Sequence, residues 1–205
     1  EKGETIAFIG STGSGKSTLI NLVPRFYDVT DGEILIDGIN VKDYTLESLN
    51  NKIGYVPQKA VMFTGTVESN VSYGDNGKKR PSLNKIKEAI DVAQGTAFVT
   101  KMDKDYKSHI ARGGTNISGG QKQRLAIARA IARDPEIYIF DDSFSALDYK
   151  TDLILRKSLK KYTKDATLMI VAQRIGTIIN ADKIVVLDEG KCVGIGTHKD
   201  LLKKC

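Results

Sequence analysis

Eight consecutive residues near the start of the chain have the types and spacing of a phosphate-binding loop. Positions 10–17 read Gly-Ser-Thr-Gly-Ser-Gly-Lys-Ser, which fits the pattern G-x-x-x-x-G-K-[ST]. Glycines let backbone N–H groups curl around phosphate oxygens, Lys16 adds a positive charge, and Ser17 offers a hydroxyl to Mg²⁺. The predicted chemistry is nucleotide binding by Gly10, Ser11, Thr12, Gly13, Ser14, Gly15, Lys16, Ser17 and Thr18.

A carboxylate follows an apolar segment later in the chain. Residues 137–140 read Ile-Tyr-Ile-Phe, which is typical of a buried strand, and Asp141 comes directly after them. Many strands end in aspartate, so this feature alone is weak. Behind a phosphate-binding loop, Asp141 is the expected second anchor for Mg²⁺, held through water.

A third segment, Ser118-Gly119-Gly120-Gln121, decides the family. Its first and fourth residues form a capping box, so the tetrapeptide alone predicts only the start of a helix. It lies between the loop and Asp141, however, and it continues as Lys-Gln-Arg-Leu-Ala-Ile-Ala-Arg-Ala. With these motifs the chain resembles the ATP-binding cassette family, whose signature is L-S-G-G-Q, over essentially its whole length. Ile117 stands in place of the signature leucine.

The resemblance implies ATP and Mg²⁺ as cofactors and a second domain of the same family as partner. In that family two domains dimerise head to tail, and the signature of one caps the ATP of the other. The resemblance also implies that Gln58 is the glutamine that touches Mg²⁺ and reports to a transmembrane domain. The implied metal ligands are Ser17, Gln58 and Asp141; the implied signature is Ser118, Gly119, Gly120 and Gln121; the implied D-loop, which crosses the dimer interface, is Ser145, Ala146, Leu147 and Asp148.

Two segments, at 25–28 and 65–71, resemble the exporter branch of the family. Its members fuse this motor to six transmembrane helices, so we expect such a domain N-terminal in the same polypeptide, at the cytoplasmic face of the cell membrane. The family's adenine-stacking aromatic residue lies upstream of the loop, so we expect the chain to begin inside a longer polypeptide. The short helical insert argues against chromosome-maintenance and DNA-repair relatives, and we expect no nucleic-acid partner. A soluble ATPase of repair or translation remains the rival from another class.

Two positions depart from the family pattern. Asp142 stands where the family has the glutamate that polarises the attacking water, and Gln173 stands where it has a histidine. Aspartate is one methylene shorter, which withdraws the carboxylate by about 1.5 Å, and a misplacement of about 1 Å can cost roughly 100-fold in rate. Glutamine hydrogen-bonds but does not titrate.

Either substitution alone is compatible with neutral drift. Together, at the positions expected to be catalytic, Asp142 and Gln173 resemble the weakened-site half of a heterodimeric bacterial exporter with a non-identical partner. An ordinary homodimeric exporter motor, in which Asp142 still catalyses well, remains the alternative.

The pattern of apolar residues predicts an α/β protein with a mostly parallel sheet and an inserted helical subdomain. The resemblance implies a P-loop NTPase (RecA-like) core and a small antiparallel part truncated at its N-terminus. The single domain covers 1–205, with its core at about 1–74 and 135–205 and the helical subdomain at about 75–134. Predicted strands cover 5–9, 32–38, 137–140, 167–171, 183–187 and 191–195; predicted helices cover 17–23, 83–93 and 118–133.

Composition adds weaker constraints. The 205 residues are 40% apolar and 27% charged, and no apolar run reaches the roughly 18 residues of a membrane span. The net charge of +6 is compatible with attraction to nucleic acid or an anionic membrane, or with a solvated surface; Lys78-Lys79-Arg80 and Lys160-Lys161 are short runs. Cys192 and Cys205 form no metal spacing or disulfide framework, which favours a reducing compartment.

Overall fold

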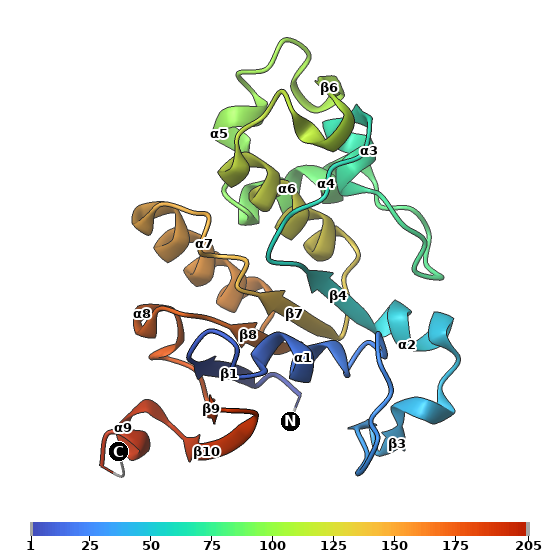
Figure 1. Ribbon diagram of the computed structural model, residues 1–205. Helices are drawn as coiled ribbons and strands as arrows, with labels where there is room; N and C mark the ends of the chain where they lie inside the picture. Colours follow the sequence, from blue (N-terminus) through green and yellow to red (C-terminus); the bar gives the residue numbers. More distant parts are fainter. Residues whose placement is uncertain (1, 204–205) are drawn as a thin grey trace. The chain divides into compact units, whose positions relative to one another are not determined.

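The computed structural model describes residues 2–203, so Cys205 lies outside the described residues. The chain divides into two compact units (Figure 1). The first comprises Glu1–Tyr55, Glu136–Asp142 and Asp165–Cys205, and the second comprises Val56–Pro135 and Ser143–Lys164. Within the described residues, no helix combines the length and the apolar character needed to cross a membrane.

The first unit is built on a six-stranded sheet in the order β10-β9-β1-β8-β7-β4. β1 pairs in parallel with β8 and β9, β7 pairs in parallel with β8, and β10 returns antiparallel along β9. The sheet is therefore mostly parallel, as predicted. Its strands are β1 (Thr5–Gly10), β4 (Ile53–Val56, whose last residue begins the second unit), β7 (Ile137–Asp141), β8 (Thr167–Val171), β9 (Lys183–Asp188) and β10 (Lys191–Gly196).

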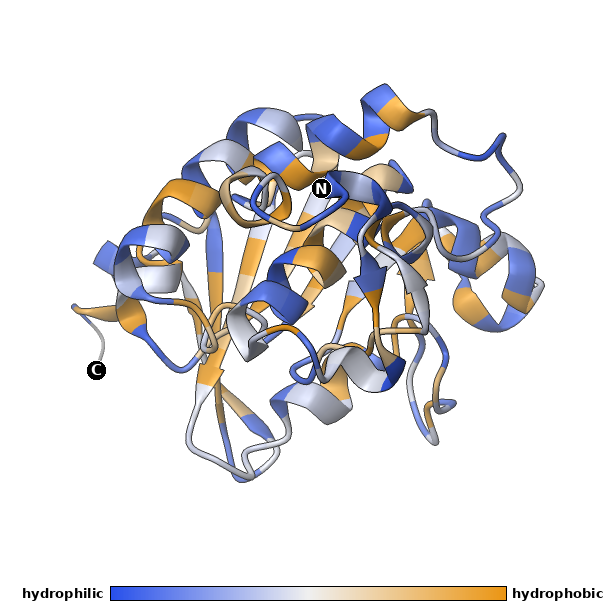
Figure 2. Cartoon of the chain, turned by 90° about the horizontal axis from the view of Figure 1, so that it is seen from above, coloured by the Kyte–Doolittle hydropathy of each residue, from blue (hydrophilic) through white to orange (hydrophobic). Residues whose placement is uncertain are grey.

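Apolar residues on the strands explain why α1 covers one face of the sheet. The strands carry much of the orange in Figure 2, and α1 packs on β1, β7 and β8. Phe8, Ile20, Ile139 and Val171 belong to one buried cluster on this face. The helices of this unit are α1 (Lys16–Asn21), α2 (Leu46–Lys52), α8 (Ile175–Ile178) and α9 (His198–Leu201), with a 3₁₀ turn η1 (Val41–Asp43).

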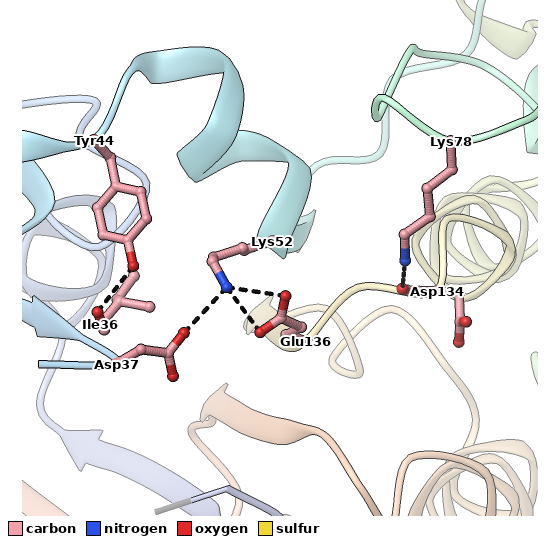
Figure 3. Close-up of polar contacts among 7 residues, drawn as sticks. All are labelled: Ile36, Asp37, Tyr44, Lys52, Lys78, Asp134 and Glu136. Carbon is pink, nitrogen blue, oxygen red and sulfur yellow. Dashed lines mark hydrogen bonds and ion pairs between the residues drawn. The ribbon is translucent and has the colours of Figure 1, made fainter. Parts of the chain in front are cut away.

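A small antiparallel hairpin of β2 (Leu35–Ile36) and β3 (Ile39–Asn40) replaces the strand predicted over 32–38. That prediction was too long, because Gly32 has a φ of 76° and Asp37 and Gly38 have φ values of 54° and 77°. Two successive positive φ values make the tight hairpin turn that Asp-Gly favours. Lys52 Nζ lies 3.1 Å from Asp37 Oδ2 and 2.9 Å from Glu136 Oε2, which ties this hairpin to the residue before β7 (Figure 3).

Helices dominate the second unit, in which α6 packs against α3 and α4, and α4 packs against α7. Ser82 caps α4 by accepting from Lys85 N, and Ser118 caps α6 by accepting from Gln121 N. The capping box predicted at Ser118 is confirmed. The elements are β5 (Gly65–Thr66), α3 (Val67–Val71), α4 (Leu83–Val92), α5 (Thr96–Val99), η2 (Asp105–Lys107), β6 (His109–Ile110), η3 (Arg112–Gly114), α6 (Gly119–Ala132) and α7 (Tyr149–Tyr162).

Candidate nucleotide-binding site

The predicted phosphate-binding loop connects β1 to α1 in the first unit. Its glycines are required by the backbone: a Cβ on Gly10 would lie 2.1 Å from the carbonyl oxygen of Leu187, a distance at which no side chain fits. Gly13 and Gly15 have φ values of 84° and 93°, a region in which glycine alone is unstrained. The loop thus leaves its backbone open to close approach, which is what a phosphate needs.

The ammonium group of Lys16 is turned into this loop. Its Nζ donates to the carbonyl oxygens of Gly10 and Ser11 at 2.8 and 2.7 Å, and to Ser14 Oγ at 3.3 Å. Only 8% of Lys16 is exposed. All three of these acceptors are neutral, so they satisfy the donors of the ammonium without cancelling its charge. The loop therefore carries a fixed positive charge that a phosphate fits.

Ser17 and Asp141 meet although 124 positions separate them in the chain. Ser17 Oγ donates to Asp141 Oδ1 at 2.8 Å, which brings a hydroxyl and a carboxylate together where β7 ends. Oxygen donors of these two kinds are what Mg²⁺ prefers in proteins. The pair fits the metal-anchoring role predicted for it.

Tyr55 also reaches Asp141, and the sequence did not single it out for this role. Its hydroxyl lies 3.3 Å from Asp141 Oδ2 and 2.9 Å from Asn21 Oδ1. Burial, and then the negative charge of Asp141 and the hydrogen bond to it, raise the pKa of Tyr55 above its ordinary value. The hydroxyl therefore stays protonated and orients the carboxylate. No sequence signal indicates this contact, because it depends on β4 lying beside β7 at the edge of the sheet.

The two substituted residues contact each other. Gln173 Nε2 donates to Asp142 Oδ2 at 3.0 Å, which joins the residue after β7 to a residue just beyond β8. Asp142 is buried, with 7% exposed, and its backbone N–H donates to Val171 O at 3.1 Å. Its φ of 46° lies in the left-handed region, which aspartate tolerates better than most side chains. The structure thus brings together two residues that were paired only by their expected role.

The remaining predicted site residues belong to the second unit. Gln58 is exposed just after β4, and the segment before it is held by Gln123 Nε2, which donates to Pro57 O at 3.1 Å, and by Ser143 Oγ, which donates to Val56 O at 2.8 Å. These two bonds, one from a side chain of α6 and one from Ser143, hold the backbone just before Gln58 in place.

The signature and D-loop segments are neighbours within that unit. A Cβ on Gly120 would lie 3.4 Å from the carbonyl oxygen of Ala146. Ser118 and Gly119 are exposed at the start of α6, whereas Leu147 is buried. Asp148 caps α7, and its hydrogen bonds from Thr151 hold the pKa of its carboxyl below the ordinary value. Several of these residues therefore have a structural role within this unit. Their role at a partner's nucleotide stays a prediction.

The parallel sheet and the loop between β1 and α1 define a P-loop NTPase fold. The family model described as ABC transporter matches residues 1–145, and the chain belongs to the ABC transporter family.

Comparisons with known proteins agree with this assignment. The chain is 49% identical over 203 residues, or 99% of its length, to an uncharacterised ABC transporter ATP-binding protein of Mycobacterium tuberculosis. It is 47% identical over 206 aligned positions to a protein of Staphylococcus aureus that is named provisionally as a multidrug export ATP-binding/permease protein. The chain spans 34% and 35% of these two relatives, about a third of their length.

A solved structure is similar to nearly the whole chain. The structure of a bacterial Atm1-family ABC exporter with ATP bound matches with a TM-score of 0.93 and 36% identity, covering 98% of this chain and 35% of that one. The family and the fold predicted from the sequence are confirmed.

Proposed function

We propose that this chain is the nucleotide-binding domain of an ABC exporter half-transporter, and that its own site binds Mg-ATP but hydrolyses it slowly. The observation that carries this proposal is the hydrogen bond from Gln173 to Asp142, next to Asp141 and in the same unit as the phosphate-binding loop. The proposed domain organisation is a core at about 1–74 and 135–205 with a helical subdomain at about 75–134.

The binding half of the proposal rests on the loop and on Asp141. Lys16 would exchange its bonds to neutral carbonyls for bonds to phosphate oxygens, which are stronger because the acceptor is charged. Ser17, Asp141 and Gln58 would hold Mg²⁺, which supplies positive charge to offset that of the phosphates. The relative solved with ATP bound supports this choice of nucleotide.

The slow-hydrolysis half rests on the substituted pair. Asp142 has a shorter side chain than the glutamate of the family pattern, and one of its oxygens is engaged by the Gln173 amide. An amide neither gains nor loses a proton as an acid or base near neutral pH, so Gln173 orients Asp142 without taking part in proton transfer. The carboxylate is thus poorly placed to orient a water, while the binding groups are untouched.

The proposed partners follow from the family and from the exposed signature. Ser118, Gly119, Gly120 and Gln121 would cap ATP held by a second, non-identical domain, with the D-loop at residues 145–148 along the same interface. The names of the relatives, which include an ATP-binding/permease protein and an exporter, support a transmembrane domain as the second partner. The domain would act at the cytoplasmic face of the membrane.

Calorimetry with Mg-ATP and phosphate release on the same purified protein test the proposal. We expect saturable binding together with turnover well below about 1 s⁻¹, the low end of ordinary enzymes. Turnover at or above that rate without a partner would contradict the weak-site proposal and favour a homodimeric exporter motor. Absence of Mg-ATP binding would contradict the assignment of the loop.

A further inference from the structure

A basic hollow of about 380 Å³ lies in the second unit. It is formed by the loop at residues 74–82, by the first turn of α4 and by the C-terminal end of α6. Asp134 is the carboxylate among the described lining residues, and the cations that line the hollow are Lys78, Lys79, Arg80, Lys85 and Arg133. We call this volume, together with the five cations that line it, the basic hollow. Folding thus places Lys85 and Arg133 beside the run Lys78-Lys79-Arg80, for which the sequence indicated no specific function.

The loop that carries three of these cations is pinned to the end of α6. Asn76 Nδ2 donates to Arg133 O at 2.8 Å, and Lys78 Nζ donates to Asp134 O at 2.8 Å (Figure 3). In return, Arg133 Nη1 donates to Asp75 O at 3.1 Å. Bonds in both directions fix the loop that carries these cations against the end of α6.

Neutral oxygens accept hydrogen bonds from three of these cations. Lys78 and Arg133 donate to carbonyls, and Arg80 donates through Nε and Nη2 to Ser72 Oγ at 3.3 and 3.0 Å. Lys85 is the exception, because Glu88 Oε2 lies 3.4 Å from its Nζ, beside a close contact to the Tyr162 hydroxyl. Carbonyls and hydroxyls orient a cation without neutralising it, so the five positive charges of the lining outweigh Asp134, its one carboxylate among the described residues.

Burial makes the charged form of Arg133 costly. Burial lowers the pKa of its guanidinium from the ordinary value, against a smaller opposing effect of Asp75. A bound anion would offset that desolvation, and it would do so most strongly where several cations face one volume.

We infer that the basic hollow binds a phosphate-bearing polyanion, at a site separate from the loop at residues 10–17. Phosphate fits better than a single carboxylate because its oxygens accept from lysine point charges and from the planar fork of arginine together. Both a free polyphosphate and a phosphorylated lipid headgroup present this chemistry. The site does not depend on hydrolysis at the nucleotide site.

Pyrophosphate titration in low salt tests the site, with Lys16→Ala as the background so that the contribution of the nucleotide loop is reduced. Lys79→Gln combined with Arg80→Gln removes two charges from the hollow. Lys160→Gln combined with Lys161→Gln removes the same number from α7 and is the matched control. We expect binding roughly 10-fold weaker in the first double variant and changed by less than about 2-fold in the second. Equal weakening in both would overturn the proposal in favour of general surface charge.

Flotation with vesicles distinguishes the two sources of phosphate. Phosphatidylcholine vesicles with and without a phosphoinositide are compared, using the same variants. Binding of pyrophosphate with no preference among vesicles indicates a free polyphosphate, and phosphoinositide-dependent binding lost in the Lys79→Gln, Arg80→Gln variant indicates a headgroup. Absence of both overturns the site. The single variant Lys79→Gln, at an exposed position, repeats the test if the double variant unfolds.

Discussion

The two ends of the candidate site differ in how closely they keep the family pattern. At the end of β1, the loop retains every residue type expected of a phosphate site, and Lys16 and Ser17 are held by short hydrogen bonds. At the ends of β7 and β8, Asp142 and Gln173 replace the expected residues, and they are bonded to each other. Both regions lie in the same unit on neighbouring strands.

We expect the first region to set the affinity for the nucleotide and the second to set the rate of its hydrolysis. Groups that hold a ligand equally well before and during reaction set affinity, whereas rate depends on groups that act in the transition state. A site altered only in the second set is expected to keep its ligand and turn over slowly. The predictions below test whether the two regions are separable in this way.

Restoring both substituted residues has the largest expected effect. Asp142→Glu combined with Gln173→His should raise hydrolysis at this site by roughly 100-fold, since misplacement of about 1 Å costs that much. Each single change should give little, because groups that act as a unit are non-additive. Steady-state phosphate release in the assembled transporter, with a sound partner signature, is the measurement.

The backbone at Asp142 makes the single changes informative. A φ of 46° suits aspartate, so Asp142→Glu alone carries a backbone cost of about 1 kcal/mol. If that single variant already reached the rate of the double, the two residues would not act as a pair, and the proposed role of the Gln173 bond would be wrong.

Lys16→Ala should break the binding region alone. It removes three hydrogen bonds and the buried charge of the loop, and we expect the Kd for Mg-ATP to rise about 10-fold to 100-fold. Isothermal titration calorimetry measures the change, with Lys160→Ala on α7 as a control that removes an exposed charge. An unaltered Kd would show that the loop does not hold the phosphates.

Ser118→Arg sharpens the comparison from the second unit. Placing a bulky cation at the exposed start of α6 should lower turnover at the partner's site by at least about 10-fold, while this chain keeps its affinity for Mg-ATP. Turnover of the assembled transporter and nucleotide binding are measured together. Ser82→Arg removes an equivalent cap from α4 and controls for lost helix stability, which is worth about 1 kcal/mol. Normal turnover would contradict the head-to-tail arrangement.

Tyr55→Phe should have the smallest effect, a loss of about 1 kcal/mol in the free energy of unfolding at neutral pH. The raised pKa of Tyr55 means that the folded protein holds this proton more tightly than the unfolded chain does. Stability from this group is therefore complete below about pH 10, the ordinary value for tyrosine, and is lost as the pH rises further.

Denaturant melts between neutral and alkaline pH measure that loss. Tyr55→Phe should show a shallower alkaline decline than the parent protein, and Tyr149→Phe, at an exposed tyrosine, should decline as the parent does. Identical slopes in the parent protein and Tyr55→Phe would mean that Tyr55 is not held protonated by its surroundings.

Much of the fold could be predicted because its signals are local. β8 has the predicted bounds, and the capping box of Ser118 with Gln121 depends on residues three positions apart. The strand predicted over 32–38 failed for a local reason too, since the positive φ values at Gly32 and Asp37 interrupt an otherwise apolar run. Turn geometry outweighed hydrophobic pattern there.

Side-chain contacts across the site were beyond such reasoning. The position of Tyr55 in β4 gave no indication that its hydroxyl would reach Asp141, because that contact depends on the order of strands in the sheet. The basic hollow is similar: Lys79 and Arg133 are 54 positions apart, and only the packing of a loop on the end of α6 brings them to one volume.

The sequence by itself determined the family, the loop that fits a phosphate and the two positions that depart from the pattern, because each is a matter of residue type at short or family-defined spacing. The tertiary structure alone decided that Gln173 donates to Asp142 and that Ser17 donates to Asp141. Hydrogen bonds act over about 3 Å, and which side chains come that close is set by the pairing of β7 with β8 and by the packing of α1 against the sheet.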